Sequence, residues 1–385
     1  MPSIAIFVHD LSATGVVRNA LAIAHHMQEV AGWRVRLLLG HEGGDLASAA
    51  EGIARDVLLT GKETRARRSR ALIRAVPRLR ALIRDNPPDI LLSAGNHAHL
   101  PCLLATRGLE RPLRVYRISN DLAHKSGNLS ALPGAIRRRL VAGWITCDAA
   151  KLVLVSPNLA QEAVLSRALR KGKAMVIRNG VPLAAVAAQK DAPAGHPWFD
   201  EDIPVLIAVG RLVQQKNFPT LLHALARARQ TRDLRLILLG GGSPEKRAEL
   251  EQLAASLGLT GALDFVGRVA NPFPYIARAT ALVLPSFWEG SANVLLEAMA
   301  CGTPVVASRT AGNAAEVVDD GRYGVLVDPA DADAMAEAIL RQCDPATRIE
   351  PGMRVQDFDI GKTLDAYARL FAELADADQP AAAAH

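Results

Sequence analysis

The chain has 385 residues, half of them apolar and 22% charged, as in an ordinary globular protein with room for two domains. It contains no run of about 18 apolar residues, which excludes a membrane-spanning segment, and its four cysteines form no Cys-x-x-Cys pair, which argues against a zinc site or a disulfide framework. The net charge of +6 is uneven, because residues 62–84 alone carry nine basic side chains and one acidic one.

The first half of the chain alternates short apolar runs with helical patterns. We expect a strand at Ile4 to Val8 rather than a leader peptide, since the N-terminus lacks a basic stretch, and a helix at Val16 to Gln28. Further strands are predicted at Arg34–Leu39, Ile90–Ser93, Arg114–Ile118, Leu152–Val155 and Ala174–Ile177.

The segment Lys62 to Arg84 has a basic amphipathic pattern, with apolar residues at helical spacing and Arg on most remaining positions. Two interpretations stay open. The segment is either a solvated Arg face over a core-facing stripe, or a surface that docks on an anionic membrane. Nucleic acid is not expected as a partner, because the aromatic content is only 4%. A smaller basic cluster, Arg137 to Arg139, precedes Leu140 and Trp144.

Residues 184–203 are rich in Pro, Ala and Asp, and are predicted to link two domains at 1–183 and 204–357. Strands of the second domain are expected at Val205–Val209, Leu234–Leu239, Ala262–Val266, Ala281–Leu284 and Val305–Ala307. Its helices are expected at Phe218–Ala228, Pro244–Leu257 and Val294–Ala300. This alternation predicts an α/β protein with two doubly wound, Rossmann-like parallel sheets and a ligand at the carboxyl ends of the strands.

The most informative stretch is 285–308, where Glu289 and Glu297 lie eight positions apart across a loop and a helix. The residues Gly290, Ser291, Ala292 and Asn293 fall at the helix N-terminus, whose free N–H groups and dipole suit a diphosphate. Carboxylates beside such a site are suited to accepting hydrogen bonds from sugar hydroxyls. The alternative is a capping residue and a surface charge, but Glu297 lies inside an otherwise apolar helix, which favours a partner or a ligand.

Two other loops carry groups that suit a nucleotide. Arg211 and Lys216 follow a strand and match the oxygens of a diphosphate, although surface cations after a strand are common. The turn at Gly240 to Ser243 occupies the place of a dinucleotide fingerprint without its spacing, which leaves an NAD-dependent dehydrogenase as an alternative. The Asp-x-Asp pairs at 331–333 and 376–378 are interpreted as helix caps or surface charge, not as metal ligands.

Together these motifs resemble glycosyltransferase family 4, which comprises retaining enzymes with the GT-B fold. The matching features are the two Glu, Gly302, Pro304 and the Val305–Ala307 run, and a Gly-Arg-Leu with a Lys five residues after its Arg. Family members usually carry Phe or Leu at the position of Ser291. The resemblance implies that a final helix at about 358–375 packs back on the N-terminal domain.

The resemblance also implies a role for each matching position. Arg211 and Lys216 would hold the diphosphate in place of a metal, so neither a metal nor another cofactor is expected. Glu289 would accept hydroxyls of the donor sugar, and Glu297 those of the ribose. His97 would orient the sugar, with His99 a weaker match. The remaining candidates are Gly15, Val266, Gly267 and Arg268 for the donor, and Asn96, Asn120 and Asp121 for the acceptor.

The implied activity is transfer of a sugar from a nucleotide-sugar, with a UDP-sugar favoured, to a hydroxyl of a lipid-linked or polysaccharide glycan in cell-envelope biosynthesis. The implied location is the cytoplasm, including the inner face of the cell membrane. A catalytically idle sugar-nucleotide-binding or scaffold protein is the alternative, since it would keep the fold and lose turnover.

Overall fold

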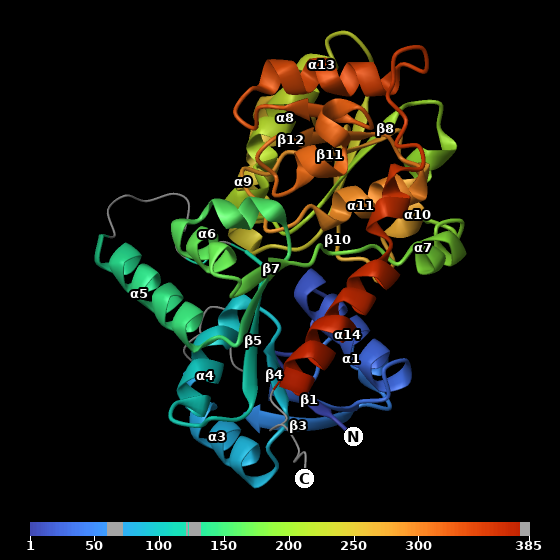
Figure 1. Ribbon diagram of the computed structural model, residues 1–385. Helices are drawn as coiled ribbons and strands as arrows, with labels where there is room; N and C mark the ends of the chain where they lie inside the picture. Colours follow the sequence, from blue (N-terminus) through green and yellow to red (C-terminus); the bar gives the residue numbers. More distant parts are fainter. Residues whose placement is uncertain (60–71, 121, 123–131, 378–385) are drawn as a thin grey trace, which may run out of the picture. The chain divides into compact units, whose positions relative to one another are not determined.

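The computed structural model describes residues 1–59, 72–120, 122 and 132–377 (Figure 1). Two compact units make up the chain. Unit 1 runs from Met1 to Asn179 and takes in the segment from Gly361 onward, and unit 2 runs from Gly180 to Ile360. Each unit contains one sheet whose described strands all pair in parallel, which confirms the predicted α/β class with two doubly wound sheets.

Unit 1 has a seven-stranded sheet in the order β3-β2-β1-β4-β5-β6-β7. The strands are β1 Ser3–Val8, β2 Arg34–His41, β3 Ala54–Leu59, β4 Ile90–Ser93, β5 Leu113–Ile118, β6 Lys151–Leu154 and β7 Ala174–Val176. The α-helices are α1 Gly15–Glu29, α3 Val76–Asp85, α4 Asn96–Thr106, α5 Leu132–Asp148, α6 Ala163–Arg170 and α14 Ile360–Ala377. Short apolar strands without alternation fit this arrangement, because both faces of the sheet are covered.

The two faces of the unit 1 sheet have separate cores. Helices α1 and α14 supply side chains to one core, where Tyr367 and Phe371 of α14 are buried and the Phe371 ring lies 6.3 Å from that of Trp33. Helices α3, α4, α5 and α6 supply the other, and neighbours in this series pack against each other (Figure 1). The last helix therefore belongs to unit 1.

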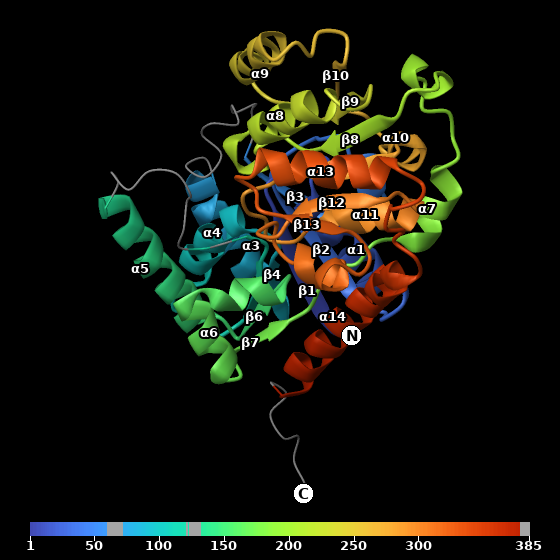
Figure 2. The ribbon, with the colours of Figure 1, turned by 90° about the horizontal axis from the view of Figure 1, so that it is seen from above.

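Unit 2 has a six-stranded sheet in the order β10-β9-β8-β11-β12-β13. The strands are β8 Val205–Val209, β9 Arg235–Leu239, β10 Leu263–Gly267, β11 Ala281–Leu284, β12 Val305–Ser308 and β13 Val325–Val327. The α-helices are α7 Leu183–Gln189, α8 Phe218–Ala228, α9 Pro244–Ser256, α10 Phe273–Arg278, α11 Asn293–Cys301, α12 Ala314–Val317 and α13 Ala332–Cys343. Figure 2 shows α13 and α8 beside each other over this sheet, and their residues are in contact.

Several elements differ from the sequence prediction. Strands β3 and β13 were not predicted, and each lies at an edge of its sheet and is only partly buried. Residues 184–203, predicted as a linker, contain α7, whose Val186 is buried in the core of unit 2. Residues Asn96–Thr106, for which no helix was predicted, form α4.

The described part of the basic segment favours the first of its two interpretations. Leu72, Leu79 and Ile83 are buried in the core, while Arg78 and Arg84 are exposed. Residues 62–71 lie outside the described residues, as do Asp121, Asp378 and the tail from 381. In the described portion of the chain, no helix combines the length and apolar character that crossing a membrane requires.

Candidate functional site

The donor-site candidates of unit 2 follow three strands of one parallel sheet. Arg211 and Lys216 follow β8, Arg268 follows β10, and residues 285–293 connect β11 to α11. Because the carboxyl ends of parallel strands share one edge of the sheet, these loops lie along the same edge. The sheet thus brings to one edge groups that are separated by up to 82 positions in the sequence.

The centre of this edge is an ion pair between two predicted site residues. Lys216 Nζ lies 2.6 Å from Glu289 Oε1, and the two side chains are only 17% and 13% exposed. Ser286 Oγ donates to the same carboxylate oxygen at 2.8 Å, and Gln215 Nε2 donates to Oε2 at 3.1 Å. The carboxylate is therefore held by one cation and two neutral donors, which fixes its orientation.

Backbone geometry after β8 brings Lys216 to this position. A short 3-10 turn, Gln214–Lys216, ends at Asn217, which adopts a left-handed conformation with φ of 51°. The buried Asn217 amide donates to the carbonyls of Pro285 and Pro329 at 3.0 and 2.6 Å. Asn is one of the few residue types that adopt this conformation readily, and its side chain here joins the β8 loop to the loops after β11 and β13.

The N-terminus of α11 is only partly available to an anion. The N–H of Ala292 donates to Asn313 Oδ1 at 3.0 Å, so this amide, predicted to face a diphosphate, already has a partner. Gly312, with φ of +60°, packs so closely that a Cβ there would lie 3.1 Å from Glu289 Cβ and 3.2 Å from Ser291 N. The hydroxyl of Ser291 is buried and has no hydrogen-bond partner among the described residues.

Glu297 occupies the second turn of α11 and is partly exposed in an otherwise largely buried helix. Its carboxylate lies near Cys301, one turn further on. Burial first, and the charge of Glu297 second, raise the pKa of the Cys301 thiol to about 12. Glu297 therefore combines a polar group with a partly solvated position, as a ligand-binding residue requires.

The Gly-rich turn after β9 has a structural explanation. Gly240 has φ of +141°, and a Cβ there would collide with the backbone carbonyl of Gly210. Its N–H donates to the Gly267 carbonyl at 2.6 Å, so the turn joins the β8, β9 and β10 loops. A Cβ at Gly241 would lie 2.9 Å from Arg268 Nε, which places that side chain over the turn. Close packing of the turn therefore explains Gly240 and Gly241, and a bound dinucleotide is not needed to explain them.

The other donor-site candidates lie on the same loops with varied exposure. Arg211 and Arg268 are exposed, whereas Val266 and Gly267 form the partly buried end of β10. Residues that the sequence reasoning missed are Gln215, Ser286, Gly312 and Asn313. Gln215 and Ser286 are close in sequence to predicted residues, but the β12 loop that carries Gly312 and Asn313 has no motif of its own.

The unit 1 candidates gather at the carboxyl edge of its own sheet. Gly95 precedes α4, and a Cβ there would lie 2.7 Å from Val16, so the first turn of α4 lies beside the first turn of α1, which begins at Gly15. His97 is exposed on that turn of α4. The structure thus brings Gly15 and His97 to one region of unit 1.

Asn96 and Asn120 are also in contact, because the side chain of Asn96 bonds to the backbone of Asn120. Asn96 Nδ2 donates to the Asn120 carbonyl at 2.7 Å, and Asn96 Oδ1 accepts from the N–H and hydroxyl of Ser119. Both ends of the Asn96 amide therefore hold the turn after β5. Asn96 therefore has a structural role, and the acceptor contact of Asn96 and Asn120 stays a prediction.

His99, the weaker of the two histidine candidates, is fully buried. Its Nδ1 lies 2.7 Å from Ser93 Oγ, and its ring meets that of Tyr116 edge-on at 5.3 Å. Burial, with smaller contributions from His97 and Arg117, lowers the pKa of His99 to about 3. His99 is therefore a neutral core residue and does not face a ligand.

This depressed pKa makes His99 a source of acid sensitivity. The unfolded chain takes up a proton at His99 near its ordinary pKa of 6.5, whereas the native chain does not until about pH 3. Stability is thus intact above pH 6.5 and falls as the pH drops through this window, by about 2 kcal/mol between pH 7 and 5. We expect His99→Gln to lose that much less over this range in chemical denaturation. The exposed neighbour variant His97→Gln should keep the wild-type slope, and identical slopes for all three proteins would contradict the assignment.

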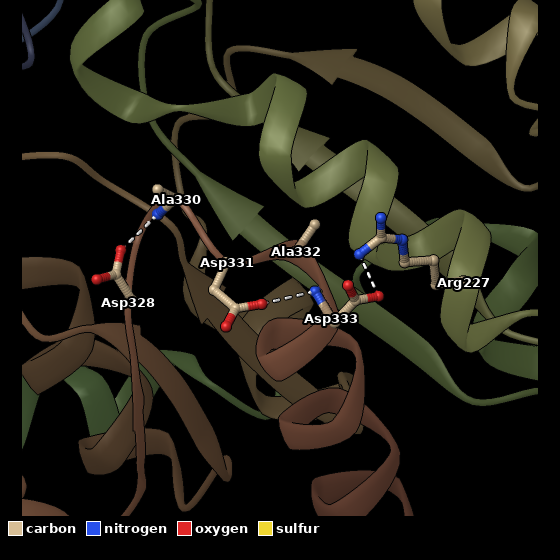
Figure 3. A pocket seen from close by; sticks show the side chains of 6 residues that line it. All are labelled: Arg227, Asp328, Ala330, Asp331, Ala332 and Asp333. Atoms are coloured by element: carbon tan, nitrogen blue, oxygen red, sulfur yellow. Dashed lines mark hydrogen bonds and ion pairs between the residues drawn. The ribbon is translucent and has the colours of Figure 1, made fainter.

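The Asp-x-Asp pair at 331–333 lines a shallow pocket, and each carboxylate has a structural partner (Figure 3). Asp331 caps α13 by accepting from the N–H groups of Asp333 and Ala334 at 3.0 and 2.9 Å. Asp333 forms an ion pair with Arg227 of α8. The interpretation as caps and surface charge is confirmed for this pair, and no group of three or more metal-ligating side chains occurs in the described residues.

Comparison with known proteins identifies the family. The sequence model described as "Glycosyltransferase Family 4" matches residues 13–185, and that described as "Glycosyl transferases group 1" matches residues 203–344. A similar curated protein is "Lipopolysaccharide core biosynthesis glycosyltransferase LpsE" of Rhizobium meliloti, 35% identical over 200 residues, which are 50% of this chain and 55% of that protein. The chain spans about half the length of the first such relatives.

Solved structures with this fold cover nearly the whole chain. Sucrose-phosphate synthase from Thermosynechococcus elongatus superimposes with a TM-score of 0.80 at 24% identity, over 98% of this chain and 100% of that one. Anabaena Alr3699/HepE in complex with UDP-glucose gives 0.77 at 20% identity, over 97% and 100%. The chain therefore belongs to the glycosyltransferases of the family 4 and group 1 type and has the GT-B fold.

Proposed function

We propose that this chain transfers a sugar from a nucleotide-sugar, with a UDP-sugar favoured, to a hydroxyl acceptor with retention of anomeric configuration. The observation that carries the proposal is the Lys216–Glu289 pair at the carboxyl edge of the unit 2 sheet, beside the N-terminus of α11. A cation for phosphate and a carboxylate for hydroxyls are the two groups that a sugar diphosphate needs. The similarity to HepE, solved with UDP-glucose, supports the choice of donor.

In this proposal the ion pair is the resting state of the donor site. When the donor binds, Lys216 turns to the diphosphate with Arg211, and Glu289 turns to the sugar hydroxyls. The exchange replaces one charge-assisted contact by two, so neither group is left without a partner. The positive charge of Arg211 and Lys216 stabilises the leaving diphosphate, which is work that a metal ion does in other transferases. We therefore expect turnover to survive a chelator.

The reaction requires one bond exchange. The acceptor hydroxyl oxygen bonds to the anomeric carbon on the face from which the diphosphate departs, and the bond from that carbon to the phosphate oxygen breaks. The acceptor proton passes to the departing phosphate oxygen. Glu297 accepts hydrogen bonds from the ribose, the backbone after β10 contacts the base, and His97 orients the donor sugar.

The acceptor proposed is a lipid-linked or polysaccharide glycan of the cell envelope, which places the protein on the inner face of the cell membrane. The support is the similarity to LpsE, a glycosyltransferase of lipopolysaccharide core biosynthesis. A thermal-shift panel of UDP- and GDP-sugars, followed by assays of donor hydrolysis and transfer, tests the proposal. Binding without any turnover would instead identify a catalytically idle binding or scaffold protein. A thermal shift with NAD alone would favour the alternative of an NAD-dependent dehydrogenase.

The sharpest test of the donor site is Glu297→Ala. We expect UDP-sugar binding to weaken by about 10- to 100-fold, because a charged acceptor of two ribose hydroxyls is lost, while the melting temperature stays close to wild type. Isothermal titration with UDP and with UDP-sugar measures the effect. Glu337→Ala, an exposed Glu on α13, is the matched control and should bind as wild type does. Unchanged affinity in Glu297→Ala would remove this residue from the site.

A further inference from the structure

Helix α5 presents an apolar stripe on its solvent side. Ile136, Leu140 and Trp144 are 56%, 54% and 56% exposed, and their spacing of four residues puts them on one face of the helix. The other large apolar side chains that are exposed in the described residues are Met1, Val30, Ile73 and Met353, which are far apart in sequence. We call the three residues of α5 the α5 stripe.

The core of unit 1 does not need the α5 stripe. The opposite side of α5 already carries the buried Ala142 and Ile145, and α5 packs against α4 and α6. Figures 1 and 2 both show α5 as an outer helix of unit 1, beyond α4 and α6. A helix that is apolar on two opposite sides has a second surface to cover, since contiguous exposed apolar side chains mark an interaction site.

The charges around the stripe are positive. Arg137 and Arg139 are exposed and, at 100° per residue, fall on either side of the line through Ile136 and Leu140. The four helices on this face of the sheet, α3 to α6, contain eight Arg and two Asp. One of those two, Asp148, is engaged by Arg114 at 3.2 Å and by the hydroxyl of Tyr116 at 2.5 Å.

We propose that the α5 stripe is the surface by which this protein docks on an anionic lipid bilayer. The three apolar side chains enter the boundary between headgroups and acyl chains, with Trp144 at headgroup depth, and the flanking Arg bind lipid phosphates. The α5 stripe would be the surface that holds the protein at the membrane, and the proposal rests on the proposed function for that membrane location. Within its described part, the segment Lys62 to Arg84 presents mainly Arg side chains and Ile73 to solvent, because Leu72, Leu79 and Ile83 are buried.

Other occupants fit the stripe less well. A second copy of the chain across a two-fold axis would bring the Arg137 and Arg139 side chains of both copies together, and like charges repel. Nucleic acid would satisfy the Arg but would leave Ile136 and Leu140 without a use, since its backbone is read by polar and charged groups. An anionic bilayer satisfies both the charged and the apolar side chains.

Co-sedimentation with vesicles tests the surface on the full chain without donor. We expect binding to phosphatidylcholine vesicles that contain phosphatidylglycerol, weakened by salt, and little binding to phosphatidylcholine alone. Arg137→Gln with Arg139→Gln should reduce the partition coefficient about 30-fold, and Leu140→Ser with Trp144→Ser at least about tenfold. Val30→Ser and Met353→Ser, which remove exposed apolar side chains elsewhere, should bind as wild type does.

A spectroscopic readout keeps the test decisive if the double Ser variant folds poorly. Brominated lipid should quench part of the tryptophan fluorescence of the wild type, whereas Trp144→Phe should still bind but lose that part. Absence of binding to anionic vesicles, or binding that these variants leave unchanged, would overturn the proposal. So would a lipid-free dimer that the Leu140 and Trp144 changes dissociate. Donor hydrolysis measured without vesicles should be unaffected in every α5 variant, which separates this proposal from the proposed function.

Discussion

Lys216→Met should lower kcat for sugar transfer by a factor on the order of 10² to 10³, with a smaller change in KM for the donor. The lysine ammonium is held in place before the donor arrives, because Glu289 pairs with it at 2.6 Å in a mostly buried setting. A preorganised cation acts most strongly where negative charge grows, on the diphosphate that departs in the transition state. Steady-state kinetics with a UDP-sugar and its acceptor measure the loss.

The chain offers a matched control for Lys216. Lys246 and Glu249 also form a Lys–Glu pair in unit 2, at 2.5 Å, but on the exposed surface of α9. Lys246→Met should leave kcat unchanged and stability within about 1 kcal/mol, as exposed pairs contribute little. Equal kinetic effects of Lys216→Met and Lys246→Met would show that the buried pair is structural only.

Glu289→Gln should distinguish the contribution of the sugar to donor binding from that of the nucleotide. We expect kcat/KM for the UDP-sugar to fall on the order of 10²-fold, because a charged acceptor of sugar hydroxyls becomes a neutral one. The affinity for UDP alone should stay equal or rise, since Lys216 no longer has a carboxylate partner and is available to the diphosphate. Titration calorimetry with UDP and with UDP-sugar gives the two affinities side by side.

Ser286→Ala is a milder change at the same carboxylate. It removes one donor to the Glu289 carboxylate, at 2.8 Å, and leaves the carboxylate itself in place. We expect a loss of activity of about tenfold or less, in KM more than in kcat, because Ser286 only positions Glu289. If UDP and UDP-sugar both bind Glu289→Gln more weakly by the same factor, Glu289 does not contact the sugar.

Much of the fold could be predicted from the sequence because its central strands are short, continuous apolar runs. Such runs are typical of parallel sheets covered on both faces, and 11 of the 13 strands in the described residues fall where the pattern predicts them. The two that were missed, β3 and β13, are edge strands. Ala54 and Arg55 are exposed at the start of β3, and β13 has only three residues, so neither gives a continuous apolar signal.

The candidate residues of the site could be proposed from the sequence, but their contacts could not. Glu289, Glu297, Arg211 and Lys216 are recognisable from their spacing. The pairing of Lys216 with Glu289, across 73 positions, comes from the adjacency of the β8 and β11 loops. The same holds for Asn313, which occupies the N–H of Ala292 that the sequence left for an anion.

The amino-acid sequence sets the period of the apolar runs, the Gly and Pro positions that end them, and the spacing of two carboxylates around a helix N-terminus. These are local properties, set by neighbouring residues along the chain. The packing of the folded chain sets which side chains are buried and which are exposed. It buried His99 and left His97 accessible, and it exposed Ile136, Leu140 and Trp144 where a pattern of apolar residues alone predicts a core. The reason is that burial depends on which elements pack against a helix, and within the described residues α5 packs against α4 and α6 on the side away from these three side chains.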